Sequence, residues 1–160
     1  MASEDRWKPS VTVAAVIESG GRYLLVEEQT GEGLRLNNPA GHLEPGESLL
    51  QAVEREVLEE TARRFSPNYL VGVYLARLRR GDDAVTYLRF AFAGSVGEAD
   101  PGRALDAGIV RTLWLTPAEI EACRERHRSP LLWRCVQDHL AGQCFPLDLL
   151  HTDGSIGAAL

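Results

Sequence analysis

Apolar and β-branched runs separated by glycine-rich breaks mark the predicted strands in the first part of the chain. Segments 11–17 (VTVAAVI) and 22–28 (RYLLVEE) have the composition of strands, and ESGG between them has the length and glycines of a hairpin connection. We therefore predict two antiparallel strands here. Segment 29–41 is rich in glycine and asparagine, which predicts a loop with a short extended piece near 34–36.

The hydrophobic period becomes helical after Ser48. Gln51 follows Ser48 by three residues, which is the spacing of a capping box at a helix N-terminus. The helix is expected to run to about Thr61. Its apolar residues at helical spacing, which should face the core, are Leu50, Val53 and Val57.

Strand patterns return in the second half of the chain. Segments 69–79 and 84–93 are joined by RGDD and predict a second hairpin, and 110–115 predicts a last strand. Segment 94–108 has several glycines and prolines and no period. It predicts a loop that is long enough for a functional role to be suspected.

Two more helices are predicted near the C-terminus. Thr116 is followed by a proline and then by Glu119, which is a second capping box, and a helix after Ser129 should stop at Gly142. Both chain ends, including 152–160, are expected to fray. Three helices among five or six strands predict one α+β domain over 1–160, with its core in about 8–150.

Composition and charge narrow the function classes. The 160 residues are 44% hydrophobic with a formal net charge of −6, which fits one globular domain and disfavours binding to a nucleic-acid polymer or an anionic membrane. Neither a signal peptide nor a membrane span is indicated, which predicts a cytoplasmic protein. Three widely spaced cysteines indicate neither a disulfide scaffold nor a zinc site. A monomer and a homodimer are both compatible with the sequence.

Three glutamates in the predicted helix form an unfavourable arrangement. Glu56, Glu59 and Glu60 are three and four residues apart, so their carboxylates repel, and they lie late in the helix, where the macrodipole disfavours anions. Hard divalent cations such as Mg²⁺ and Mn²⁺ prefer such oxygen donors, and the absence of histidine or cysteine argues against zinc. A solvated acidic helix face is the alternative.

A longer spaced pattern surrounds these glutamates. The residues of this pattern are Gly41, Glu47, Arg55, Glu56, Val57, Glu59 and Glu60. Their spacing resembles the Nudix box of the Nudix hydrolases, G-x5-E-x7-R-E-U-x-E-E-x-G-U, where U is apolar. The chain departs from that pattern at Ala62 and Arg63, where the box has a glycine and an apolar residue. Alanine adopts the left-handed conformation of a helix C-cap at a cost of about 1 kcal/mol.

The resemblance implies a fold and a reaction. It implies an α/β/α sandwich with a mixed sheet, and hydrolysis of a phosphoanhydride bond in a small-molecule substrate with Mg²⁺ or Mn²⁺ as cofactor. Segments such as NPAGHLEPGESL, YLRFAF and RSPLL are similar to Nudix phosphatases that act on nucleoside di- and triphosphates and on thiamine-type pyrophosphates. The alternative is a catalytically silent Nudix-fold module that binds or senses a nucleotide.

The resemblance also implies roles for the residues that match the box. Glu59 and Glu60 correspond to the principal metal ligands, and Glu56 to a position that adds a ligand or acts as general base. The backbone carbonyl of Ala40 corresponds to a further metal contact. Arg55 is expected to orient the glutamates by charged hydrogen bonds.

Further candidates have two interpretations each. Glu47 is either a first-turn acid favoured by the helix dipole or a metal ligand. A later acid is expected from the loop at 94–108, where Asp106 is preferred because it precedes the last strand, and the other candidates are Glu98 and Asp100.

Substrate-binding candidates lie outside the box helix. Arg89 and Tyr87 alternate along a predicted strand and so share one face of the sheet, where Arg89 either binds phosphate or forms a surface salt bridge. His42 follows the box glycine and either meets the substrate or is solvated.

Overall fold

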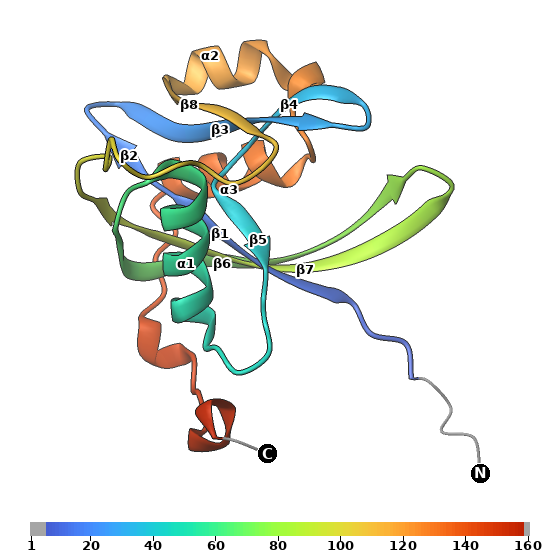
Figure 1. Cartoon of the computed structure of the whole chain (residues 1–160), viewed down its shortest axis with the longest axis vertical. Helices are drawn as coiled ribbons and strands as arrows, with labels where there is room; N and C mark the ends of the chain where they lie inside the picture. Colours follow the sequence, from blue (N-terminus) through green and yellow to red (C-terminus); the bar gives the residue numbers. More distant parts are fainter. Residues whose placement is uncertain (1–5, 159–160) are drawn as a thin grey trace.

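The computed structural model describes residues 6–158, and the ends expected to fray at 1–5 and 159–160 lie outside this range. Two four-stranded sheets form the framework (Figure 1). The first has the order β5-β1-β7-β6 and is mixed, because β1 pairs parallel to β7 while the other pairs are antiparallel. Its strands are β5 (Ala40–His42), β1 (Ser10–Val16), β7 (Asp83–Val96) and β6 (Phe65–Arg80).

The second sheet is built around one central strand. β3 (Arg22–Thr30) pairs along one edge with β8 (Ile109–Leu115) and along the other edge with two short strands. These are β2 (Glu18–Ser19) at the start of β3 and β4 (Gly33–Asn37) at its end. This sheet is entirely antiparallel.

The helices agree with the sequence prediction. They are α1 (Leu49–Thr61), α2 (Pro117–Ala122) and α3 (Leu131–Leu140). Both predicted capping boxes are present, at Ser48 and at Thr116. Short 3₁₀ turns follow at Arg124–Arg126, Leu147–Leu149 and Gly154–Gly157. No helix within 6–158 has the length and apolar character that a membrane crossing requires.

β1 lies between the helical layers and is apolar on both faces. Val13 and Ala15 pack in one buried cluster with residues of α1. Ala14 and Val16 point the other way, into a cluster with residues of α2 and α3. A strand buried on both faces reads as a continuous apolar run, which explains VTVAAVI. The α/β/α layering with a mixed sheet is therefore confirmed (Figure 1).

The predicted pairing of 11–17 with 22–28 is wrong. β1 pairs with β5 and β7, and only Glu18–Ser19 pair with the start of β3. The turn itself is correctly predicted, because Gly20 (φ 59°) and Gly21 (φ 79°) both have the positive φ of a type I′ turn. The chain changes sheets just before this turn, since β1 is apolar on both faces and is buried between two other strands.

Other boundaries also differ from the prediction. Segment 29–41 contains β4, which is longer than the predicted extended piece, and the start of β5, which is too short to show a periodicity. β6 begins at Phe65, before the predicted start at 69, and β7 ends at Val96 rather than 93. The tail is not frayed throughout, because Gly154–Gly157 form a 3₁₀ turn that the side chain of Asp153 caps.

α1 ends at a strained residue. Ala62 has φ 56° and ψ 25°, and within 6–158 it is the one non-glycine residue with a positive φ. Its N–H donates to the carbonyl of Leu58 (3.0 Å), so the helix closes as it would with the expected glycine. Alanine therefore supplies the left-handed cap at an energetic cost.

We expect Ala62→Gly to stabilise the protein. Glycine removes the left-handed strain of about 1–2 kcal/mol, partly offset by a larger loss of backbone entropy, so the free energy of unfolding should rise by about 0.5–1 kcal/mol. Urea denaturation followed by circular dichroism measures the change. Ala52→Gly, a buried helical site in α1, is the control and should destabilise by about 1 kcal/mol or more. Equal destabilisation by both variants would contradict the strain at Ala62.

Candidate functional site

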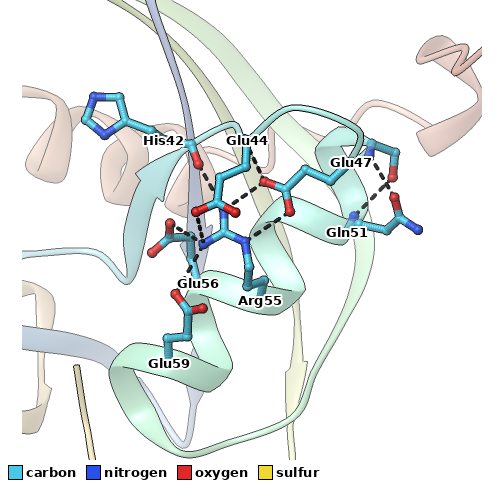
Figure 2. Close-up of polar contacts among 8 residues, drawn as sticks. His42, Glu44, Glu47, Gln51, Arg55, Glu56 and Glu59 are labelled. Carbon is cyan, nitrogen blue, oxygen red and sulfur yellow. Dashed lines mark hydrogen bonds and ion pairs between the residues drawn. The ribbon is translucent and has the colours of Figure 1, made fainter. Parts of the chain in front are cut away.

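The guanidinium of Arg55 is the centre of the acidic site (Figure 2). Its Nε and Nη2 donate to the two carboxylate oxygens of Glu47 (3.0 and 2.7 Å), which is a bidentate pair. Nη1 donates to Glu56 (2.8 Å) and Glu59 (3.1 Å), and Nη2 also donates to the carbonyl of His42 (2.9 Å). Arg55 therefore holds the segment before α1 against the helix.

These bonds explain two shifted pKa values. The hydrogen bonds from Arg55 hold the pKa of Glu47 below its usual range, although partial burial opposes this shift. Glu47, followed by Glu56, in turn raises the pKa of Arg55. Both oxygens of Glu47 are engaged by Arg55, and Oε1 also accepts from the N–H of Glu44 (2.8 Å). Glu47 stands as a partner of Arg55 rather than as a free oxygen donor.

Glu56 lies against the box glycine. The residue is 8% exposed, and a Cβ on Gly41 would meet its Oε1 at 2.0 Å. Any side chain at Gly41 would therefore push the carboxylate away from β5. Burial raises the pKa of Glu56, the bonds from Arg55 oppose this, and the charges of Glu59 and Asp106 add to the rise.

Glu60 lies under the edge of the first sheet. Its Oε2 accepts from the N–H of Ala40 (3.0 Å). Ala40 lies opposite Ala14, next to the bond from the N–H of Ala15 to the carbonyl of Pro39, so both backbone groups of Ala40 point away from β1. The carbonyl of Ala40 thus faces the same side as Glu60. Burial, assisted by nearby carboxylates, raises the pKa of Glu60 to about 9.

The loop before β8 supplies one acid near this cluster. The N–H of Asp106 donates to the carbonyl of Glu59 (2.9 Å), and the charge of Asp106 contributes to the raised pKa values of both Glu56 and Glu60. Asp100 instead caps its own turn through Gly102. The structure therefore brings Asp106 to the cluster, whereas Asp100 is engaged within its loop.

The donor set fits a hard divalent cation. Within residues 6–158, no three histidine, cysteine or acidic side chains are grouped so that they could hold a metal ion as they stand, and Arg55 engages Glu56 and Glu59. However, all donors are oxygens, one guanidinium faces four glutamates, and the buried Glu60 has a strongly raised pKa. A divalent cation, whose charge is higher than that of the Arg55 guanidinium, would offset this excess of negative charge.

A cavity of about 130 Å³ lies on the other face of the first sheet. Arg89 and Ala91 are two residues apart in β7, so their side chains share one face of the sheet. Ala91 packs in the cluster with residues of α2 and α3, and Arg89 therefore faces away from α1. Ala40 and Gly41 also line the cavity, which places β5 between it and the carboxylates. Of the described residues that line it, none is acidic, and the arginines among them are Arg80, Arg89 and Arg128.

Arg89 has no acidic partner to balance its charge. It is 7% exposed, its Nη1 and Nη2 make only long bonds to the side chains of Asn38 (3.4 Å) and Asn37 (3.5 Å), and its Nε has no hydrogen-bond partner. No salt bridge to Arg89 exists within 6–158. Of the two interpretations of Arg89, the surface salt bridge therefore does not form, and an anionic ligand would supply the missing partner.

The other predicted substrate residues also line this cavity. The rings of His42 and Tyr87 lie 6.3 Å apart, and the guanidinium of Arg80 lies 5.6 Å from the ring of Tyr87.

Sequence reasoning missed Arg80, Arg128 and Asn37, which reach the cavity from three separate segments. It also missed Glu28, a buried acid of β3. Burial of a charged residue is not visible in a strand sequence. Arg128 is the first residue of the RSPLL segment, and the resemblance of that segment to Nudix phosphatases was the signal that could have indicated it.

Comparisons with known proteins agree with this architecture. The family model of the NUDIX domain matches residues 6–134. The phosphatase NudJ of Escherichia coli K12 is 33% identical over 144 residues, which cover 90% of this chain and 92% of that protein. These matches span both the acidic site and the cavity.

Solved structures agree in fold. A NUDIX hydrolase from Nitrosomonas europaea has 52% sequence identity and a TM-score of 0.85, and the match covers 91% of this chain and 98% of that one. A UDP-X diphosphatase has a TM-score of 0.69 at 17% identity, covers 88% of this chain and 66% of that one, and shows the fold alone. The chain belongs to the Nudix hydrolase family.

Proposed function

We propose that this enzyme hydrolyses phosphoanhydride bonds of nucleoside di- or triphosphates, or of related pyrophosphates such as thiamine-type compounds, with Mg²⁺ or Mn²⁺. A pyrophosphatase-type activity follows from the family, whose members generally use divalent metal ions. The observation that carries the proposal for this chain is the position of an oxygen-only carboxylate cluster beside a cavity lined by arginines.

The carboxylates have two proposed roles: most donate oxygens to the cation, and Glu47 positions Arg55. Glu59 and Glu60 are the proposed ligands, with the Ala40 carbonyl on the same side as Glu60. Glu56, fixed by Arg55 and by Gly41, either adds an oxygen or accepts the proton of the attacking water. When bound, the cation neutralises phosphate charge and lowers the pKa of a bound water. Asp106 is a further proposed donor, whereas Glu47 keeps Arg55 in place.

The cavity suits the remainder of an anionic substrate. Arg89 and Arg80 present positive charge that no acid of the cavity balances, and guanidinium groups bind phosphate oxygens in pairs. His42 and Tyr87 offer aromatic faces at the same place. A substrate that crosses β5 would place its anhydride near the carboxylates and another anionic or aromatic group near these residues.

A substrate panel with metal tests the reaction. We expect turnover with Mg²⁺ or Mn²⁺ and a fall in kcat/KM of about 100-fold or more for Glu59→Gln and for Glu60→Gln, because each removes charge where the transition state develops it. Product analysis across nucleotides, nucleotide sugars, dinucleoside polyphosphates and thiamine pyrophosphate separates phosphate from pyrophosphate release. Glu54→Gln, an exposed site on the same helix, is the control and should retain activity.

Two results would overturn the proposal. One is full activity in the double variant Glu59→Gln plus Glu60→Gln. The other is tight nucleotide binding that is indifferent to metal and gives no turnover, which is the behaviour of a silent binding module.

Arg89→Gln tests the cavity separately. Loss of a charged hydrogen-bond donor to the substrate costs about 1.5–3 kcal/mol, so we expect KM to rise at least about tenfold. Arg77→Gln, on an exposed part of the same hairpin, should leave KM unchanged. Steady-state kinetics on the best panel substrate gives both values. An unchanged KM in a folded Arg89→Gln protein would exclude the cavity as the substrate site.

A further inference from the structure

Two adjacent buried glutamates of β3 face opposite layers of the molecule. Glu27 is 3% exposed and Glu28 is 8% exposed. Because side chains alternate along a strand, Glu27 lies on the same face of β3 as Leu25, which packs with residues of α2 and α3. Glu28 lies on the opposite face, with Leu24, which packs in a cluster with residues of α1. Glu28 therefore faces the layer that carries the acidic site.

Both carboxylate oxygens of Glu27 are satisfied by ion pairs with arginines. Arg111 donates to Oε1 (2.9 Å), and Arg126 donates to Oε2. The hydrogen bond from Arg111, opposed by burial and assisted by Arg126, holds the pKa of Glu27 below its usual range. Because both oxygens have a guanidinium partner, this residue needs no ligand.

Only one of the two carboxylate oxygens of Glu28 has a hydrogen-bond partner. Arg128 Nη1 donates to its Oε2, whereas Oε1 is buried and has no hydrogen-bond partner. A buried carboxylate oxygen without a partner loses its hydration and gains nothing in return, so such an atom requires an explanation. The residue that carries this free oxygen lies on the face of β3 that packs toward α1.

Backbone bonds tie this part of β3 to the acidic site. The N–H of Gln29 donates to the carbonyl of Gly108 (2.8 Å), and the N–H of Asp106 in the same loop donates to the carbonyl of Glu59 (2.9 Å). In agreement with this connection, the charge of Glu28 contributes, after burial and the charge of Glu56, to the raised pKa of Glu60. Glu28 thus approaches the cluster from the strand side, opposite α1.

We propose that Glu28 is a further oxygen donor of the cation site, acting together with Glu60 through its free Oε1. This inference rests on the proposed metal-dependent function. Divalent Mg²⁺ and Mn²⁺ take carboxylate oxygens, and a donor from β3 would close the site on the side away from α1. Arg128 holds the other oxygen and so fixes the direction in which Oε1 points.

The same ion pair joins the cation site to the cavity. The N–H of Arg128 donates to the carbonyl of Leu36 (2.9 Å), which fixes the segment before α3 against β4. Arg128 also lines the cavity. The residue that orients Glu28 therefore lies among the groups that face the substrate.

Mn²⁺ binding, followed by electron paramagnetic resonance of the free ion, tests the donor independently of turnover. We expect Glu28→Gln to weaken Mn²⁺ binding about tenfold or more. Glu27→Gln is the matched control: it removes a carboxylate of similar burial from the neighbouring residue of the strand, one whose two oxygens both have arginine partners, and it should leave Mn²⁺ affinity unchanged. Arg128→Gln keeps the Glu28 carboxylate and should weaken binding less than Glu28→Gln does.

Thermal unfolding with and without Mn²⁺ keeps the test independent of altered stability. Wild type, Glu27→Gln and Arg128→Gln should be stabilised by Mn²⁺, and Glu28→Gln less so. Wild-type affinity in a folded Glu28→Gln protein would refute the donor role while leaving the proposed function intact. An equal loss of affinity in Glu27→Gln would also refute it. Absence of Mn²⁺ binding and of turnover in wild type would refute the proposed function itself.

Discussion

The guanidinium of Arg55 connects the two parts of the chain that make the acidic site. It bonds to Glu47 and to the carbonyl of His42 in the segment before α1, and to Glu56 and Glu59 within the helix. The same positive charge therefore fixes a loop and offsets repulsion between carboxylates late in a helix. It thereby holds the segment that follows β5 against α1.

The edge strand of the first sheet ends at the residue whose carbonyl Arg55 bonds. β5 is three residues long and pairs with β1 on one side alone, so the outward backbone groups of Ala40 are free for other partners. One of them, the N–H, is used by Glu60. β1 in turn is held between the helical layers because it is apolar on both faces. The position of the acidic site thus follows from burial of one central strand.

Local signals predicted the acidic helix well. The capping box at Ser48 and the glutamate spacing act within a few residues, so the sequence displays them directly, and even Ala62 closes the helix as the pattern requires. Non-local features were not predictable in this way. The partners of β1 depend on which faces other segments cover, and the pair of Glu28 with Arg128 joins residues 100 positions apart. Neither residue is unusual until the fold brings them together.

The two charged regions lie on opposite sides of β5, with carboxylates on the α1 side and arginines on the α3 side. A phosphoanhydride carries negative charge along its length, so in the proposed mode of binding the substrate would meet guanidinium groups at one end and a cation at the other. Arg128 belongs to both regions, because it lines the cavity and holds Glu28. If Glu28 is a cation ligand as we propose, an anionic group that binds Arg128 draws on the same guanidinium that orients Glu28, and occupation of the cavity and the geometry of the cation site are then coupled through one ion pair.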